Sequence, residues 1–289
     1  MSIEFDNLHA PLQPLRIKGI EGDVYIQRDD LIHPLVSGNK WRKLQYHILY
    51  ARQQGKTRLV TFGGAYSNHL LATAAAGAIL GLQTTAFLRA DEPIDNHYLR
   101  AARLFGMELI PVSREDYRDK QGLYDAHFGH HAHAMFIAEG GAGEAAWEGV
   151  AGIVKSLPFA PDYILHASAT ATTAIGLGKG IQACGYKTRV YAVAVLNNVE
   201  EQRRLIQEAV LSEIVEVLEG YTFGGYAKTT DFLMDFVKSA IAQTGILFDP
   251  VYTGKALWAL QDMALPGRGV FLHTGGSMGL FSEAFLRRL

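Results

Sequence analysis

Short runs of β-branched and other apolar residues alternate with longer segments of helical periodicity along most of the chain. Residues 58–64 (RLVTFGG) and 83–90 (QTTAFLRA) have the composition of buried strands, and 67–81 between them carries apolar residues at helical spacing. The alternation continues further on, where strands are expected at 163–168, 189–196, 246–252 and 269–276. We therefore predict an α/β protein built from right-handed βαβ units with mostly parallel sheets.

A glycine-rich stretch near the middle of the chain, 140–152, separates two groups of these units. We predict two three-layer α/β/α domains, each with a sheet covered on both faces. The larger domain would be discontinuous, with 1–42 and 151–289, and the smaller would be inserted as 43–150. A ligand site is expected in the cleft between them, because such interfaces commonly form pockets.

Composition narrows the class of protein. The 289 residues include 27 Lys and Arg against 29 Asp and Glu, for a net charge of −2, and the two signs are interspersed. No basic surface for nucleic acid is indicated, no apolar run is long enough to span a membrane, and the N-terminus lacks a secretory-signal pattern. Cys184 is the only cysteine, so no intrachain disulfide can form. We expect a cytoplasmic protein that binds neither nucleic acid nor membrane.

Clusters of small and polar residues stand at the expected strand-to-helix junctions. They are 37–43 (SGNKWRK), 63–69 (GGAYSNH), 166–176 (HASATATTAIG) and 273–277 (HTGGS). Ligands of open α/β sheets bind at the carboxyl ends of the strands, which is where these clusters lie. One such motif is a weak signal, but its recurrence indicates a binding site.

Lys40 is the candidate for a covalent bond to a cofactor. Gly38 and Asn39 permit a tight turn before it, and it stands at a helix start beside Arg42 and Lys43. The helix dipole and the two cations lower the pKa of an amine, which must lose its proton to form a Schiff base. The alternative is a lysine that merely lies on a solvated helix start.

Two further clusters offer anion sites at helix N-termini. Ser67, Asn68 and His69 could bind a carboxylate through hydroxyl, amide and backbone N–H groups, although Ser67 or Asn68 could also be only the N-cap. The second cluster matches neither the P-loop nor GxGxxG, but its small residues and backbone N–H groups could hold a phosphate. It consists of Ala169, Thr170, Ala171, Thr172 and Thr173.

Tyr226 in a glycine-rich loop, and Tyr252 and Thr274 at expected strand ends, complete the candidate set. A tyrosine hydroxyl beside a reacting centre can transfer a proton, although buried tyrosines more often serve packing. The histidines of 127–133 (HFGHHAH) lack carboxylate or cysteine partners at metal-ligand spacing, so no metal site is expected.

The motifs QRDDL, SGNKWRK, GGAYSNH, AEGG, ATATTAIG, DPVYTGK and HTGG occur in this order over nearly the whole chain. Together they resemble the 1-aminocyclopropane-1-carboxylate (ACC) deaminase / D-cysteine desulfhydrase family. That family belongs to the pyridoxal 5'-phosphate (PLP) enzymes of fold type II, which are similar to the tryptophan synthase β subunit. The resemblance implies that PLP is the cofactor and that Lys40 is the Schiff-base lysine.

The resemblance also implies roles for the other candidates. Ser67 and Asn68 would meet the substrate carboxylate and the cofactor ring, and Ala169–Thr173 would hold the phosphate. Tyr226 and Tyr252 would lie in the active site, and Thr274 would face the pyridine nitrogen.

Departures from the family pattern affect these expectations. Ala169 and Ala171 stand where glycines are usual, and we expect alanine to fit there only if φ is negative. Thr253 stands where deaminases have a Glu that keeps the pyridine nitrogen protonated. A hydroxyl stabilises a pyridinium less than a carboxylate does, which disfavours opening of an unactivated cyclopropane ring. The resemblance therefore favours D-cysteine desulfhydrase-like α,β-elimination, which yields pyruvate, sulfide and ammonia.

The alternatives are ACC deaminase activity and racemase or dehydratase action on a small amino acid such as serine. An alternative of a different class is a non-catalytic α/β binding protein. We expect a small amino acid as the substrate and a homodimer as the assembly.

Overall fold

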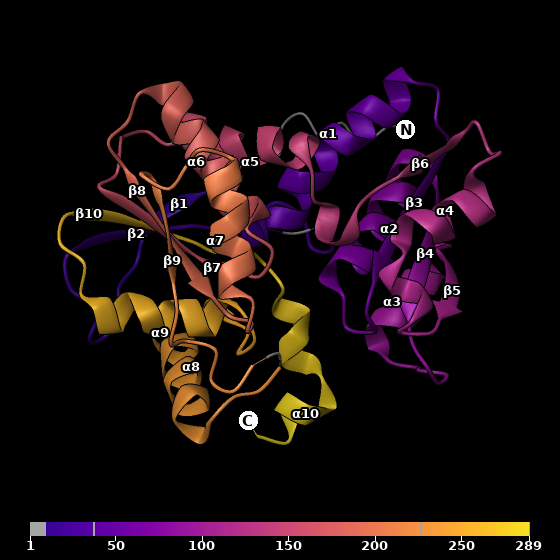
Figure 1. Ribbon diagram of the computed structural model, residues 1–289. Helices are drawn as coiled ribbons and strands as arrows, with labels where there is room; N and C mark the ends of the chain where they lie inside the picture. Colours follow the sequence, from indigo (N-terminus) through magenta and orange to yellow (C-terminus); the bar gives the residue numbers. More distant parts are fainter. Residues whose placement is uncertain (1–9, 37, 226, 289) are drawn as a thin grey trace. The chain divides into compact units, whose positions relative to one another are not determined.

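A computed structural model describes residues 10–36, 38–225 and 227–288 of the chain. These residues form two compact units, each built on its own sheet (Figure 1). Among the described residues, the larger unit contains 10–32, 38–39 and 147–288, and the smaller contains 33–36 and 40–146.

The larger unit has a six-stranded sheet. Its strands are β1 (Leu12–Pro14), β2 (Asp23–Gln27), β7 (Tyr163–Ser168), β8 (Arg189–Ala194), β9 (Val215–Leu218) and β10 (Arg268–Leu272). They lie in the order β1-β2-β10-β7-β8-β9, and all neighbours run parallel except β1 and β2. Gln27 at the end of β2 is paired with Leu272 at the end of the parallel strand β10, so the segments that follow the two strands start side by side at the carboxyl end of the sheet.

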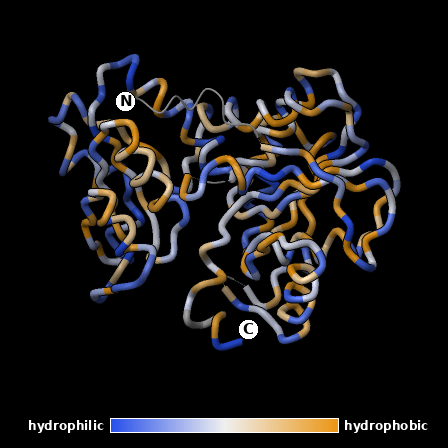
Figure 2. Tube along the Cα trace, turned by 180° about the vertical axis from the view of Figure 1, so that it is seen from behind, coloured by the Kyte–Doolittle hydropathy of each residue, from blue (hydrophilic) through white to orange (hydrophobic). Residues whose placement is uncertain are grey.

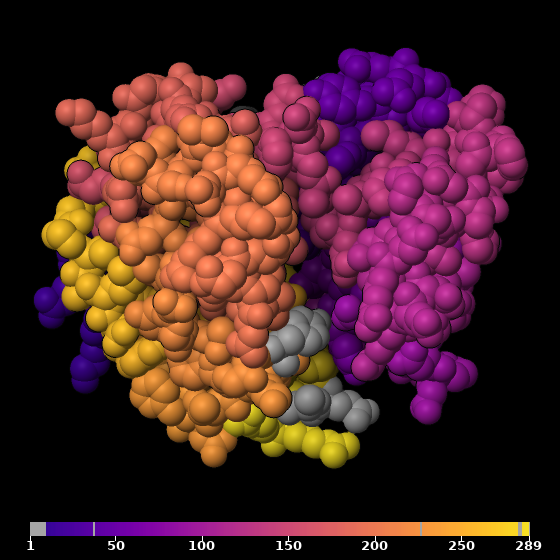
Figure 3. All heavy atoms as spheres, in the orientation of Figure 1, coloured from indigo at the N-terminus to yellow at the C-terminus, as the bar shows by residue number. Residues whose placement is uncertain are grey.

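Helices cover both faces of this sheet. One face carries α5 (Glu144–Ser156), α6 (Thr172–Cys184) and α7 (Val199–Glu208), and the other carries α8 (Asp231–Thr244) and α9 (Thr253–Met263). Successive strand residues alternate between the two cores: Ile164 packs with the first group of helices, and Leu165 packs with the second. The salmon-to-orange atoms of the segment that includes α7 and α8 form much of the surface of this unit in Figure 3.

The smaller unit has a parallel four-stranded sheet in the order β5-β4-β3-β6, which are Glu108–Val112, Gln83–Arg89, Arg58–Gly63 and Ala134–Phe136. Helices α2 (Asn68–Leu80) and α3 (His97–Leu104) pack on one face. Helix α4 (Lys120–Phe128) packs on the other, where the rings of Phe62 and Phe87 stack with centroids 5.1 Å apart. Helix α1 (Asn39–Gln53) begins at the last residue of the larger unit's second segment and continues into the smaller unit.

The predicted fold class is confirmed, because both sheets are mostly parallel and alternate with helices. The strand expected at 246–252 is wrong: the carboxylate of Asp249 accepts the N–H groups of Val251 and Tyr252, which a strand would direct to a neighbouring strand. Phe248 is nevertheless fully buried, which accounts for the apolar pattern of this segment.

Hydrophobic residues recur along the strands and helices, and hydrophilic residues occupy many of the connecting loops (Figure 2). The last described helix, α10 (Glu283–Leu286), is short. Of the helices that the structure describes, none has both the length and the hydropathy that crossing a membrane requires.

Candidate active site

The turn before Lys40 is fixed by a close backbone contact that only glycine permits. Gly38 has a φ of +65°, and a Cβ on it would lie 2.0 Å from the carbonyl oxygen of Thr274. Its N–H donates to the carbonyl oxygen of Asp29 at 2.8 Å. The segment that leads into Lys40 is therefore packed against the segment that follows β10, with no room for a side chain at residue 38.

Asn39 holds this turn against two other segments of the larger unit. Its N–H donates to the carbonyl oxygen of Thr274 at 3.2 Å. Its side-chain Nδ2 donates to the hydroxyl of Thr173 at 3.2 Å. Asn39 is thus bonded to Thr173 and to Thr274. Both belong to segments of the larger unit for which the sequence predicted cofactor binding.

The N-terminus of α6 has the features of an anion site. Residues 171–174 are buried, and no side chain caps the helix. The N–H of Thr172 donates to the carbonyl oxygen of Thr170 at 2.6 Å, and the next N–H groups of the first turn remain available. The expectation that alanine fits this loop only with a negative φ was wrong for Ala171, whose φ is +54°. A left-handed alanine costs about 1–2 kcal/mol, and it persists because the surrounding contacts hold the loop.

Those contacts come from the segment that starts α7. The Asn198 side chain donates to the carbonyl oxygen of Ala169 at 2.8 Å, and Gln202 donates to Asn198 at 2.9 Å. The hydroxyl of Ser168 donates to Gln202 at 2.5 Å. These hydrogen bonds link the loop at Ala169 to the start of α7 and to the end of β7.

The amine of Lys40 is suited to covalent chemistry. Burial of the amine lowers the pKa of Lys40 to about 8, although part of the side chain remains accessible to solvent. An appreciable fraction is therefore unprotonated near neutral pH, as attack on a carbonyl carbon requires. One turn further on, Lys43 is only 3% exposed, and burial together with the charge of Lys40 lowers the pKa of Lys43 well below its usual range.

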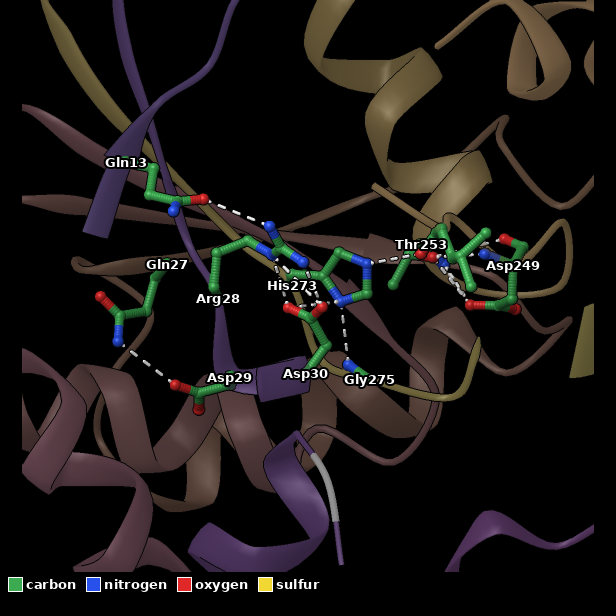
Figure 4. A network of polar contacts seen from close by, with 10 residues as sticks. Gln13, Gln27, Arg28, Asp29, Asp30, Asp249, Thr253, His273 and Gly275 are labelled. Atoms are coloured by element: carbon green, nitrogen blue, oxygen red, sulfur yellow. Dashed lines mark hydrogen bonds and ion pairs between the residues drawn. The ribbon is translucent and has the colours of Figure 1, made fainter. Parts of the chain in front are cut away.

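Figure 4 shows a polar network that places the segment after β10. Arg28 binds the carboxylate of Asp30, with Nη2 and Oδ2 2.7 Å apart. His273 Nδ1 lies 3.5 Å from Asp30 and accepts the N–H of Gly275 at 3.2 Å. The imidazole proton is therefore on Nε2, which donates to the carbonyl oxygen of Leu247 at 2.9 Å. The bonds of His273 to Gly275 and Leu247 fix both neighbours of Thr274.

A second part of this network fixes the start of α9 (Figure 4). The buried Asp249 carboxylate accepts backbone N–H groups from Val251, Tyr252 and Thr253 at 2.7–3.0 Å. The Thr253 hydroxyl donates to Asp249 Oδ2 at 2.8 Å and accepts the Asp249 N–H at 2.8 Å. Burial raises the pKa of Asp249, and the bonds from Thr253 and Tyr252 oppose this effect.

Lys255 anchors the glycine-rich loop that precedes Tyr226. Its Nζ donates to the carbonyl oxygens of Thr222 at 2.6 Å and Gly225 at 2.9 Å. Burial lowers the pKa of Lys255 to about 8, against the opposing charge of Asp249. Tyr226 itself lies outside the described residues.

In the smaller unit, the loop after β3 leads directly into α2. Ser67 is the N-cap of α2, and its hydroxyl accepts the N–H of Leu70 at 3.4 Å. That bond uses a lone pair of the hydroxyl, so its hydrogen can still be donated to a ligand. Asn68 is the first helical residue and is partly exposed. Both alternatives for Ser67, capping and ligand binding, are therefore compatible.

The side chain of His69 points into the smaller unit. It is 2% exposed, and its Nε2 lies 2.8 Å from the hydroxyl of Thr61. Thr61 donates its hydrogen to the carbonyl oxygen of Ile137, so His69 Nε2 must be the donor to Thr61. Burial, with the charges of Lys40 and Lys43, lowers the pKa of His69 well below its usual range. Any contact of His69 with a substrate would therefore involve its backbone.

The histidine-rich run 127–133 lies apart from these residues in the sequence and shows no metal-site geometry. The His127 ring packs edge-on against Phe87, with ring centroids 5.1 Å apart. Within 10–36, 38–225 and 227–288, no group of three or more His, Cys, Asp and Glu side chains is placed to hold a metal ion.

Comparison with known proteins identifies the family. The model of the family described as "Pyridoxal-phosphate dependent enzyme" matches residues 4–275. The chain belongs to this PLP-dependent family. A Thermotoga maritima protein provisionally named 1-aminocyclopropane-1-carboxylate deaminase is 32% identical over 289 residues, with 92% of each chain covered.

Two further proteins are similar over nearly their whole length. D-cysteine desulfhydrase of Salmonella typhimurium is 29% identical over 317 residues, covering 97% of this chain and 95% of that one. The crystal structure of an ACC deaminase homologue has 29% sequence identity and a TM-score of 0.84, covering 100% of this chain and 96% of that one. The resemblance to this family that was drawn from the motifs is confirmed.

Two groups next to Asn39 have the chemistry that PLP requires: the first turn of α6, which its side chain contacts, and Lys40, which follows it in the chain. The uncapped, buried N-terminus of α6 could hold the phosphate, and the amine of Lys40 could bond the aldehyde. The hydroxyl of Thr274 makes no hydrogen bond with another described residue, which leaves it available to the ring of PLP.

Sequence reasoning missed the residues that support this site. Asp249 was overlooked, although an Asp before the first turn of a helix is a common capping signal. Lys255, Asn198 and Gln202 were also missed, because each acts through a backbone or amide contact that no local pattern reports.

Proposed function

We propose that this PLP-dependent enzyme catalyses α,β-elimination on a small amino acid, with D-cysteine as the substrate. One water is consumed, and pyruvate, sulfide and ammonia are released. The observation that supports this proposal is the hydrogen bond of the Thr253 hydroxyl to Asp249. Its hydroxyl hydrogen is already donated to Asp249, so Thr253 has neither a carboxylate nor a free hydrogen to offer a pyridine nitrogen.

The roles of the residues follow from their chemistry. PLP supplies the electron sink for loss of the α-proton. Lys40 would hold the cofactor through its amine and, once the substrate amine has replaced it, take the proton from the α-carbon. The hydroxyl of Ser67 and the backbone N–H groups of Asn68 and His69 would bind the substrate carboxylate. The side chain of Asn68 would contact the cofactor ring.

The remaining site residues would bind the cofactor or handle protons. Tyr252 and Tyr226 would supply a proton to the departing sulfur. Thr274 would face the ring nitrogen, and a neutral nitrogen accepts its hydroxyl hydrogen. The phosphate would be held by Ala169, Thr170, Ala171, Thr172 and Thr173.

Substrate comparison tests the reaction. With the enzyme saturated in PLP, D-cysteine should release pyruvate and sulfide several orders of magnitude faster than ACC releases ammonia. Each pKa unit of lost pyridinium stabilisation is worth about 1.4 kcal/mol, and a few units would slow ring opening accordingly. L-cysteine and both serine enantiomers complete the panel. Faster ring opening of ACC would overturn the argument from Thr253, and faster racemisation or serine dehydration would point to those activities.

Borohydride reduction tests the role of Lys40. Reduction of the PLP-bound enzyme followed by peptide mapping should place the label on Lys40. Lys43 and Lys255 are the internal controls, because the pKa of each is also lowered by burial. A label on either would contradict the assignment. Loss of visible PLP absorbance in Lys40→Ala would exclude a non-catalytic binding protein.

We also propose a cytoplasmic homodimer with domain limits of 43–150 for the smaller domain and 1–42 with 151–289 for the larger. Exposed apolar side chains on the larger unit, Phe232, Phe281 and Leu286, support an interface between copies. Sedimentation velocity tests the assembly, and expression of residues 43–150 as a separate fragment tests the domain limit.

A further inference from the structure

The carboxyl ends of the strands in the smaller unit form a pocket of about 490 Å³. Its lining is rich in cations and consists of Arg89, Arg114, Tyr117, Arg118, Lys120 and Glu139. These residues lie at the carboxyl ends of three parallel strands of this sheet. Arg89 ends β4, Glu139 follows β6, and four residues follow β5: Arg114, Tyr117, Arg118 and Lys120. Ligands of parallel sheets bind at this end of the strands.

The charges in the pocket do not balance. Arg114 is paired with Asp91 at 3.0 Å, and Lys120 is paired with Glu139 at 3.4 Å. Arg89 and Arg118 make no ion pair with any carboxylate in the part of the chain that the structure describes. Two guanidinium groups are thus left without a counter-charge on the wall of one pocket.

Tyr117 holds the pocket in shape. Its side chain is 3% exposed, and its buried hydroxyl lies beside the Glu139 carboxylate. The Arg89 guanidinium lies 5.5 Å from the centre of its ring, and Lys120 Nζ lies 4.7 Å from it. Cation–π contacts of this kind orient both cations. Burial, with the nearby Glu139 carboxylate, raises the pKa of Tyr117, so the hydroxyl remains a hydrogen-bond donor.

We propose that this pocket binds a small oxyanion of the phosphate, phosphate monoester or sulfonate class. The planar guanidinium groups of Arg89 and Arg118 match the oxygens of such an anion. The volume is larger than inorganic phosphate needs, so a short organic group attached to the anion also fits.

The anion could come from either of two sources. It could be a free metabolite, or it could be the distal end of an anionic substrate. The second source is supported by the loop that leads to Ser67: a Cβ on Gly64 would lie 3.6 Å from Arg89 Nη2. The pocket therefore borders the loop for which we propose substrate-carboxylate binding.

Direct binding tests the pocket independently of the reaction. Inorganic phosphate is titrated into the PLP-loaded enzyme by calorimetry in a phosphate-free buffer. Arg89→Gln and Arg118→Gln should each weaken phosphate binding about tenfold or more, which corresponds to about 1.4 kcal/mol. Arg103→Gln is the matched control, since it removes the same charge from an exposed site of the same unit that is paired with Asp95. It should leave binding unchanged.

Activity measurements separate the two sources. If the ligand is a free anion, phosphate changes the kinetics of D-cysteine breakdown, and Arg118→Gln abolishes that effect. If it is the distal end of the substrate, Arg118→Gln raises the KM for cysteate or O-phosphoserine and leaves the KM for D-cysteine unchanged. Either result supports the site. Absence of phosphate binding to the wild type, or equal binding by Arg118→Gln, overturns it, whatever the outcome for D-cysteine.

Discussion

The side-chain amide of Asn39 donates a 3.2 Å hydrogen bond to the hydroxyl of Thr173, which lies 134 residues further along the chain. The backbone N–H of Asn39 donates to the carbonyl oxygen of Thr274, also at 3.2 Å. The residue before the candidate catalytic Lys40 is thus fixed to the candidate phosphate loop and to the segment after β10. Lys40 and the cofactor phosphate would be positioned by one amide, and this coupling can be measured.

Asn39→Ala should weaken PLP binding by about 0.5–1.5 kcal/mol, because it removes this hydrogen bond. Thr173→Val removes the same bond and any contact of the hydroxyl with the phosphate, so its loss should be at least as large. In the double variant the losses should not add, since the bond can be lost only once. The measurement is PLP affinity of the apoenzyme by fluorescence titration. Asn39→Ala with Thr244→Val is the control pair, because the Thr244 hydroxyl bonds only nearby residues of its own segment, Ala240 and Ile246. Full additivity for Asn39 and Thr173 would show that the two side chains act separately.

Gly38→Ala should abolish PLP binding and lower stability severely. Its Cβ would overlap the carbonyl oxygen of Thr274, in addition to the strain of a positive φ. Gly55→Ala is the matched control, since Gly55 has the same φ of +65° with no atom within 4 Å of a Cβ. The control should lose only about 1–2 kcal/mol in urea denaturation. Similar losses for both variants would mean that the contact with Thr274 is unimportant.

Ala171→Gly should be neutral or should stabilise the protein by up to about 1 kcal/mol. Glycine removes the strain of a φ of +54°, and this gain exceeds or offsets its larger entropy in the unfolded chain. Ala169→Gly should instead cost about 0.5–1 kcal/mol, because Ala169 has no positive φ to relieve. The free energy of unfolding of the apoenzyme measures both. The opposite order would contradict a left-handed residue 171.

The rate at which PLP attaches to the apoenzyme should depend on pH through Lys40. Only the neutral amine reacts, and burial lowers the pKa of Lys40 to about 8. The rate should therefore rise about tenfold per pH unit below pH 8 and level off above it. Stopped-flow absorbance measures the rate. A model amine with an ordinary pKa near about 10.4 is the control, and its rate should continue to rise through this range. A plateau at the same pH for both would assign it to PLP.

Thr253→Val should destabilise the protein by about 1–3 kcal/mol, because it removes a hydroxyl donor from the buried carboxylate of Asp249. It should also raise the pKa of Asp249 further. Thr253→Ser retains the hydroxyl and should stay near the wild type. Urea denaturation of both apoenzymes gives the comparison. If valine and serine behave alike, the hydroxyl of Thr253 is free for another role, and the argument about the pyridine nitrogen fails.

The sequence by itself determined the α/β class and singled out the candidate cofactor motifs. Alternation of buried strands with helices shows in local periodicity, and the small, polar residues after β3, β7 and β10 mark the ends of strands. It also singled out Gly38, Asn39 and Lys40, because a turn before a helix is a local property. The apolar run around Phe248 was wrongly predicted to be a strand. The local sequence pattern indicates that these residues are buried, but it does not indicate which groups accept their backbone hydrogen bonds.

The tertiary structure alone decided which polar groups are already engaged. The Thr253 hydroxyl is bonded to Asp249, and the imidazole of His69 is bonded to Thr61. Neither side-chain group is therefore available to a ligand, and nothing in the sequence indicated this. The positive φ of Ala171 is maintained by hydrogen bonds to its loop, such as the one from the Asn198 side chain to Ala169. The cationic pocket combines residues that follow separate strands. Each of these features depends on distances between residues far apart in the chain, and periodicity carries no information about such distances.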